Sequence, residues 1–172
     1  RRLADLTGGL GVDTAAFCAA GFEVLYNEMD QDLYDAARSN LPAIGCGGVT
    51  FRNTEITDGQ SVDDILGDFI PDIIFLDPAR RADDGRKVFL LEECRPDVLK
   101  LKDKLLEKAE TLMIKLSPMA DIDMVCSRLG PRCRQMHIMA SRGECRELLA
   151  VMRRDGGSGS MRQDGGESLK IT

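Results

Sequence analysis

The stretch Leu3-Ala-Asp-Leu-Thr-Gly-Gly-Leu-Gly-Val-Asp-Thr14 decides the fold. A short apolar run ends at the carboxylate of Asp5, and a glycine-dense turn leads into residues 12–20, whose pattern predicts an amphipathic helix. Glycines at such a turn permit a positive φ and allow a ligand to lie directly against the backbone. The free N–H groups that begin the following helix point to the same place. The stretch therefore predicts a strand, a ligand-binding loop and a helix.

The spacing within the loop distinguishes between two kinds of ligand. In the dinucleotide fingerprint G-x-G-x-x-G the third glycine allows close packing of the helix on the strand, but Thr14 occupies that position here. Asp5 and Asp13 also bracket the loop with negative charge, which repels a pyrophosphate and suits a ligand with a cationic amine and a sulfonium. A glycine turn that binds no ligand is the simpler alternative.

The loop pattern is similar to that of a known enzyme class. Asp5-x-Thr7-Gly8-Gly9-x-Gly11-x-Asp13 resembles motif I of the class I S-adenosylmethionine-dependent methyltransferases. The resemblance implies S-adenosylmethionine as cofactor. It also assigns the binding of the methionine moiety to this loop, through Asp5, Thr7, Gly8, Gly9, Gly11 and Asp13.

Acidic residues follow the second and third predicted strands, residues 22–27 and 49–54. Glu28 lies 23 residues after Asp5, where an acidic residue beside the first turn of a parallel sheet can accept hydrogen bonds from ribose hydroxyls. It could instead cap the next helix, expected over 30–40. By the resemblance, Glu55 lies near the adenine amine, although Asp58 is almost as well placed.

A continuous apolar run over 71–76 predicts a buried central strand of a parallel sheet. It ends at Asp77-Pro78-Ala79-Arg80-Arg81, at the edge where open α/β sheets bind ligands. Asp77-Pro78 followed by arginine resembles motif IV of the methyltransferases. The resemblance implies that Asp77, Pro78 and Arg80 form the catalytic side from which the acceptor approaches, with Asp77 also near the cofactor.

Asp-Pro-Ala-Arg is most similar to the version of motif IV in RNA uracil-C5 methyltransferases, which place a cysteine nucleophile just after the fifth strand. Lys115-Leu-Ser-Pro-Met119 stands there in this chain, and Ser117 without a neighbouring base is a poor nucleophile. The two segments together resemble a bacterial family of candidate methyltransferases that carry an added THUMP-like region, over residues 1–153. THUMP domains are associated with RNA binding, so the resemblance implies RNA as the acceptor. Arg80 and Arg81 would then seat the RNA, or else pair with neighbouring acids.

The remaining pattern completes the predicted sheet. Helices are expected over 62–67, with Ser61 as N-cap, over 97–110, and over 121–128, with Asp121 as N-cap. Between them lie a polar loop over 83–87, a short helical piece over 88–94 and a fifth strand over 111–116. Residues 135–140 and 144–153 then predict two strands joined by a tight turn.

We therefore predict an α/β, Rossmann-like, doubly wound domain with a mostly parallel seven-stranded sheet and an antiparallel terminal hairpin. A nicotinamide-dependent oxidoreductase is the main alternative, but Thr14 and the hairpin argue against it. A module that keeps the cofactor fold without catalysis is a second alternative.

Composition limits the remaining possibilities. At 172 residues with 43% apolar composition, the chain fits one packed domain over 1–154, followed by a flexible linker or tail over 155–172. Because the chain opens directly on a strand and closes on this tail, we expect one or more further domains outside it. No apolar run approaches 18 residues, so no membrane span is predicted.

Charge and cysteine spacing bear on partners and location. Residues 1–70 carry 4 basic and 12 acidic groups, a net charge of −8, whereas residues 71–172 have a net charge of +2. A nucleic-acid partner must therefore be held by a local patch or by another region. The six cysteines have no C-x-x-C spacing, which indicates reduced thiols and a cytoplasmic location, and no metal site is expected. His137, the single histidine, is expected in the core.

Overall fold

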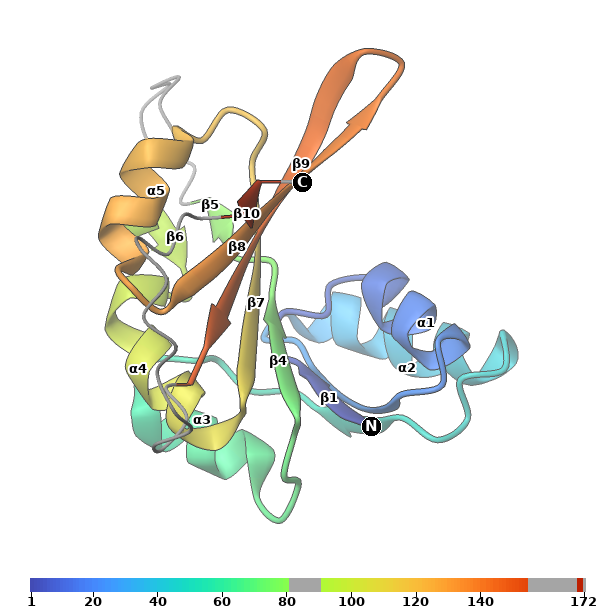
Figure 1. Ribbon diagram of the computed structural model, residues 1–172. Coiled ribbons are helices and arrows are strands. Elements are labelled where there is room, and N and C mark those ends of the chain that lie inside the picture. The colour runs from blue at the N-terminus through green and yellow to red at the C-terminus, as the bar shows by residue number, and fades with distance from the viewer. Residues whose placement is uncertain (81–90, 155–169, 172) are drawn as a thin grey trace.

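The computed structural model describes residues 1–80, 91–154 and 170–171, and its centre is one twisted sheet (Figure 1). Five parallel strands, in the spatial order β7-β4-β1-β2-β3, form most of it. They are β1 (Arg2–Asp5), β2 (Glu23–Asn27), β3 (Thr50–Arg52), β4 (Ile73–Leu76) and β7 (Thr111–Leu116).

A long hairpin closes the other edge of the sheet. Strand β9 (Glu144–Arg153) pairs antiparallel with both β7 and β8 (Cys133–Ser141), so it lies between them. Arg142 and Gly143 adopt positive φ at the hairpin turn, and Figure 1 shows this end projecting beyond the body of the domain. The prediction of a mostly parallel seven-stranded sheet with an antiparallel terminal hairpin is confirmed. The short strand β10 (Lys170–Ile171) adds outside β8.

Helices cover both faces of the sheet, as a doubly wound fold requires (Figure 1). Helices α1 (Val12–Ala19) and α2 (Gln31–Ala43) lie on one face. Helices α3 (Gly59–Leu66), α4 (Val98–Lys108) and α5 (Ile122–Leu129) lie on the other. The largest buried cluster packs these three helices against the sheet through residues such as Leu105 and Ile74.

The register of the parallel strands places the carboxyl ends of β1, β2 and β4 side by side. Asp5 at the end of β1 is aligned with Tyr26 in β2 on one side and with Phe75 in β4 on the other. The residues that follow these three strands therefore meet at a single edge of the sheet. This is the edge where the sequence predicts the cofactor and acceptor motifs.

Helix boundaries differ from the sequence predictions where capping decides them. Helix α3 begins at Gly59, because the Asp58 carboxylate accepts the Ser61 N–H at 2.9 Å while the Ser61 hydroxyl accepts the Asp58 N–H at 3.1 Å. The prediction that Ser61 is the N-cap is therefore wrong; Asp58 is the N-cap, and Ser61 is the third residue of the helix and the N3 member of the capping box. The prediction of Asp121 as N-cap of α5 is confirmed, since its carboxylate accepts the Met124 N–H at 2.9 Å.

A short antiparallel ribbon flanks the acceptor motif. Strand β5 (Ala79–Arg80) pairs with β6 (Cys94–Arg95), which follows the 3-10 turn η1 (Leu91–Glu93). The polar loop predicted over 83–87 lies outside the described residues, as do Arg81 and most of the tail predicted over 155–172. Within the described part, none of the helices is both long and apolar enough to cross a membrane.

Candidate functional site

The glycine loop after β1 has a backbone that side chains would disrupt. Gly9 and Gly11 have φ of 52° and 84°, in the left-handed region that favours glycine. A Cβ on Gly8 would lie 2.1 Å from the ring of Tyr26, whereas a Cβ on Gly9 would meet no heavy atom within 4 Å. A side chain at position 8 would therefore clash with Tyr26, which requires glycine there. Gly9, by contrast, borders open space.

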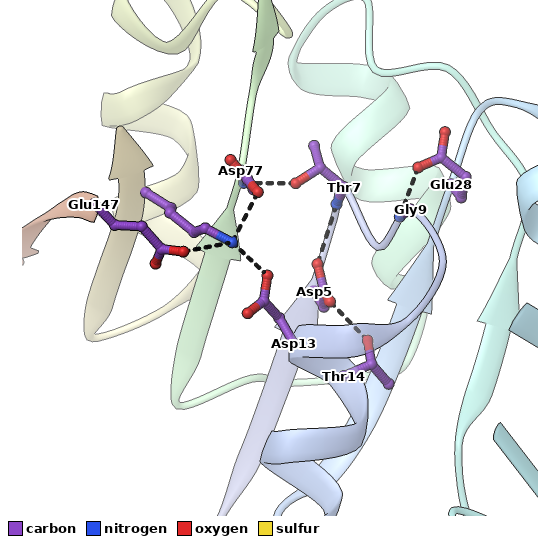
Figure 2. Close-up of polar contacts among 9 residues, drawn as sticks. Asp5, Thr7, Gly9, Asp13, Thr14, Glu28, Asp77 and Glu147 are labelled. Carbon is purple, nitrogen blue, oxygen red and sulfur yellow. Dashed lines mark hydrogen bonds and ion pairs between the residues drawn. The ribbon is translucent and has the colours of Figure 1, made fainter. Parts of the chain in front are cut away.

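Glu28, which follows β2, is bonded directly to this loop (Figure 2). The Gly9 N–H donates to Glu28 Oε2 at 2.8 Å, and the Asp30 N–H donates to Oε1 at 2.9 Å. The Tyr26 hydroxyl donates to the Gly9 carbonyl at 2.6 Å from the same strand. With 8% of its surface exposed, the Glu28 carboxylate is fixed in orientation beside the open side of the loop.

Asp5 lies beneath the loop, fully buried. The Thr14 hydroxyl donates to Asp5 Oδ2 at 2.6 Å, and the Thr7 N–H donates to Oδ1 at 3.3 Å. Burial raises the pKa of Asp5 from 3.8 to about 7, against the opposing effect of these two hydrogen bonds. Thr14, which replaces the third glycine of a dinucleotide fingerprint, thus supplies the main hydrogen bond to this carboxyl group.

A pocket of about 790 Å³ opens at the carboxyl ends of β1, β2, β3 and β4, within the size range of small-ligand sites. Five of the predicted site residues line it, and they come from four separate segments: Thr7, Gly9, Glu28, Glu55 and Asp77. The other predicted loop residues, Asp5, Gly8, Gly11 and Asp13, do not line it. Asp58, the alternative to Glu55, caps α3.

The wall opposite the glycine loop comes from the acceptor motif and the start of α4. Ala79, Arg95, Pro96, Asp97 and Lys100 line it. Pro78 is buried beside the pocket, and Arg80 belongs to β5, although its side chain and all of Arg81 lie outside what the structure describes. The structure therefore places the backbone of the predicted acceptor side next to the pocket.

Lys115 forms ion pairs both with the start of α1, next to the glycine loop, and with the acceptor motif after β4. Its ammonium nitrogen lies 2.9 Å from Asp13 Oδ2, 3.1 Å from Asp77 Oδ2 and 3.8 Å from Glu147 Oε1. Burial lowers the pKa of this lysine, but its bonds to Asp13 and Asp77 more than offset that effect, so the pKa is raised overall. The Asp77 N–H also donates to the Thr7 hydroxyl at 2.6 Å, a second link between the loop and the acceptor motif.

Sequence reasoning missed Lys115, Glu147 and Asn27 as site residues. Asn27 donates to the carbonyls of Leu6 and Thr54 at 3.1 and 3.0 Å and so ties three strand ends together. A polar residue within a buried apolar strand was the available signal for both Asn27 and Lys115. No sequence signal pointed to Glu147, because only the hairpin pairing brings it to β7.

Other expectations concern residues away from the pocket. His137 lies half-buried in β8 and outside the buried clusters, so the expectation that it is a core residue is wrong; it does not line the pocket either. All six cysteines are free thiols. The described residues contain no group of three histidine, cysteine, aspartate or glutamate side chains that could hold a metal ion.

The strand order and the antiparallel β9 define the fold of the class I methyltransferases. A candidate methyltransferase from Porphyromonas gingivalis W83 superimposes with a TM-score of 0.74 at 31% identity, over 90% of this chain and 37% of that chain. This chain thus spans little more than a third of that protein.

Two further structures share the fold at lower identity. An RNA methyltransferase from Salinibacter ruber, in complex with S-adenosyl-L-homocysteine, has a TM-score of 0.53 at 18% identity, over 95% of this chain and 84% of that chain. An rRNA methylase from Streptococcus thermophilus has a TM-score of 0.59 at 16% identity, over 88% and 86%. No protein-family model matches the chain, and no curated protein matches it either.

Proposed function

We propose that this domain binds S-adenosylmethionine and transfers its methyl group to an acceptor. The observation that carries the proposal is the contact between the glycine loop and the acid after β2, with Gly9 N–H at 2.8 Å from Glu28 Oε2 on the wall of a pocket. A backbone without side chains thus adjoins a fixed carboxylate that can accept hydrogen bonds from ribose hydroxyls. The class I methyltransferase fold and the S-adenosyl-L-homocysteine held by the S. ruber enzyme support the same cofactor.

The residues present fit this cofactor. The open space above Gly9 leaves room for a ligand against the loop, and Glu55 extends the pocket beyond Glu28. We assign the methionine moiety to the loop from Thr7 to Gly9, the ribose to Glu28 and the adenine amine to Glu55. Asp5 contributes by holding Thr7 of the loop and Thr14 of α1 in place, and Asp13 pairs with Lys115.

Bound S-adenosylmethionine supplies an electrophilic methyl group on a sulfonium, so the protein must mainly position an acceptor for in-line attack. We assign this task to Asp77, Pro78 and Arg80, which follow the central strand β4. The Asp77 backbone is held by the Thr7 hydroxyl at 2.6 Å, so the acceptor motif is built directly against the proposed cofactor loop. Ser117 Oγ accepts the Met119 N–H at 3.2 Å, a turn contact, and none of its bonds within the described residues is to a base.

We further propose that the acceptor is RNA, in the cytoplasm. Two structures that share the fold are RNA methyltransferases, and the acceptor motif of this chain contains the adjacent arginines 80 and 81. Around Lys115, three carboxylates face one ammonium group, which leaves a net negative charge beside Asp77. We therefore place the RNA phosphates away from this point, at the arginines.

Two alternatives make different demands on the same site. A nicotinamide-dependent oxidoreductase needs a pyrophosphate on the glycine loop, yet Asp5 and Asp13 bracket that loop and Thr14 takes the place of the third glycine. A non-catalytic module needs only the pocket. The loop-to-acceptor link through Thr7 and Asp77 favours an enzyme over such a module.

The test is transfer of radiolabelled methyl from S-adenosylmethionine to total RNA, DNA and protein, with the Gly9→Val variant as control. We expect label in RNA with the native chain and none with the variant, because valine at a φ of 52° is strained and fills the space above the loop. Label that appears only in protein or DNA would contradict RNA as acceptor. Absence of label from all three pools, together with absence of cofactor binding, would contradict methyl transfer.

A further inference from the structure

Lys115 sits among three carboxylates that come from different parts of the chain. Figure 2 shows Asp13 in α1, Asp77 after β4 and Glu147 in β9 converging on one nitrogen, with separations of 2.9, 3.1 and 3.8 Å. The lysine side chain is only 20% exposed, whereas the three acids are 37%, 43% and 42% exposed. The ammonium group is therefore the inner member of the cluster, and the carboxylates form its solvent side.

The cluster controls a side chain that nothing else in the described structure fixes. The Thr7 hydroxyl holds the backbone of Asp77, and among the described residues the Asp77 carboxylate pairs, through Oδ2, with Lys115 alone. Asp77 also lines the pocket, so this ion pair fixes a carboxylate at the pocket wall. An exposed aspartate without such a partner would exchange among rotamers.

The charges of the four side chains also make this arrangement depend on Lys115. Asp13, Asp77 and Glu147 are like charges gathered around one point, so they separate if the central cation is removed. Two neighbouring carboxylates and burial act on Lys115 in opposite directions, and the carboxylates prevail, so the lysine stays cationic. It therefore acts as a permanent charge rather than as a proton donor or acceptor.

We propose that Lys115 is a positioning residue for methyl transfer. It orients the Asp77 carboxylate toward the acceptor, and its ion pairs with Asp13 and Glu147 connect Asp77 to α1 and to the terminal hairpin. The inference rests on the proposed function. Because Lys115 contacts neither Gly9 nor Glu28, its removal should impair the orientation of the acceptor and leave the proposed cofactor contacts in place.

A matched ion pair elsewhere in the chain provides the control. Lys104 in α4 lies 2.9 Å from Asp63 in α3, with both side chains about one-third exposed, and it does not line the pocket. Lys104→Met therefore removes an ion pair of similar length away from the site, while Asp63 keeps Lys108 at 2.6 Å as its second partner. If Lys115 had only a structural role, Lys115→Met and Lys104→Met would have similar effects on kcat.

The experiment compares Lys115→Met, Lys115→Arg and Lys104→Met with the native chain. Calorimetry measures the affinity for S-adenosyl-L-homocysteine, and label transfer to total RNA measures kcat and KM. For Lys115→Met we expect kcat to fall by about 10- to 100-fold, as misplaced catalytic groups do, with cofactor affinity within about threefold of native. Lys115→Arg should recover a substantial part of kcat, since it restores the charge, and Lys104→Met should behave as native.

A double-mutant cycle tests whether Lys115 acts through Asp77. If it does, Asp77→Asn and Lys115→Met each lower kcat, and the double variant is no slower than the slower single variant. Fully additive losses, or a native kcat in Lys115→Met, would overturn the proposal. Lys115→Gln replaces Lys115→Met if thermal unfolding shows that the methionine variant does not fold. Native protein that binds S-adenosyl-L-homocysteine but does not methylate RNA would overturn this inference, whereas failure to bind it would overturn the proposed function itself.

Discussion

Replacing Asp5 with asparagine should change how stability depends on pH. Burial raises the pKa of Asp5 from 3.8 to about 7, with hydrogen bonds from Thr14 and Thr7 opposing the rise and the charges of Asp13 and Asp77 adding to it. Between about pH 4 and pH 7 the folded state therefore holds a proton that the unfolded chain has released. The contribution of this group to stability is fully present below the unfolded pKa and is lost as the pH rises through the folded pKa.

The size of the effect follows from the shift. A rise of about 3 units at about 1.4 kcal/mol each corresponds to about 4 kcal/mol of stability lost by pH 8. Asparagine has nearly the same shape, does not titrate, and can still accept the Thr14 hydroxyl. The unfolding free energy of Asp5→Asn minus that of the native chain should therefore increase by about 2–4 kcal/mol between about pH 4.5 and pH 8.

Urea unfolding followed by circular dichroism across this pH range measures that difference. Other titrating groups are common to both proteins and cancel. The matched control is Glu110→Gln, which removes an exposed carboxylate that follows α4. A difference that stays constant with pH, or one that decreases as the pH rises, would refute the assignment of Asp5 as a buried carboxyl group with a raised pKa.

Three further substitutions test the loop and its neighbours. Gly8→Ala should destabilise the fold by about 1–3 kcal/mol, because its Cβ would lie 2.1 Å from the Tyr26 ring; chemical denaturation measures this. Gly9→Ala meets no such clash and should cost about 1–2 kcal/mol through its positive φ alone, so an equal or larger loss than at Gly8 would contradict the packing. Glu28→Ala should weaken S-adenosyl-L-homocysteine binding about tenfold or more in calorimetry, by removing the proposed ribose acceptor; native affinity would exclude that role.

Much of the fold could be predicted because its signals are local. The apolar run before Asp77 and the glycine turn after Asp5 set two strand ends, and the tight turn at residues 141–143 set the terminal hairpin. The positions of Glu28 and Asp77 at the pocket follow from these, because parallel strands end at the same edge. Helix boundaries that side-chain caps determine were harder to predict. At α3, for example, the N-cap is Asp58, whereas the sequence suggested Ser61.

The contacts that join distant segments could not be predicted. Lys115 and Asp13 are separated by 102 residues, and their ion pair depends on how α1 packs beside β7 and β9. The burial of Asp5 under the loop likewise depends on the position of Thr14 in α1, which the sequence presents only as a departure from a glycine pattern. Sequence motifs therefore identified the loop, but not the charge network that connects it to Asp77.

The most direct test of the central claim is a crystal structure of this chain with S-adenosyl-L-homocysteine. We predict that the ligand lies in the pocket at the ends of β1, β2 and β4. Its ribose hydroxyls should lie within hydrogen-bond distance of the Glu28 carboxylate, and its methionine moiety should lie against Gly9. Ligand density at another place on the protein, or crystals soaked at saturating concentration that show none in this pocket, would contradict it.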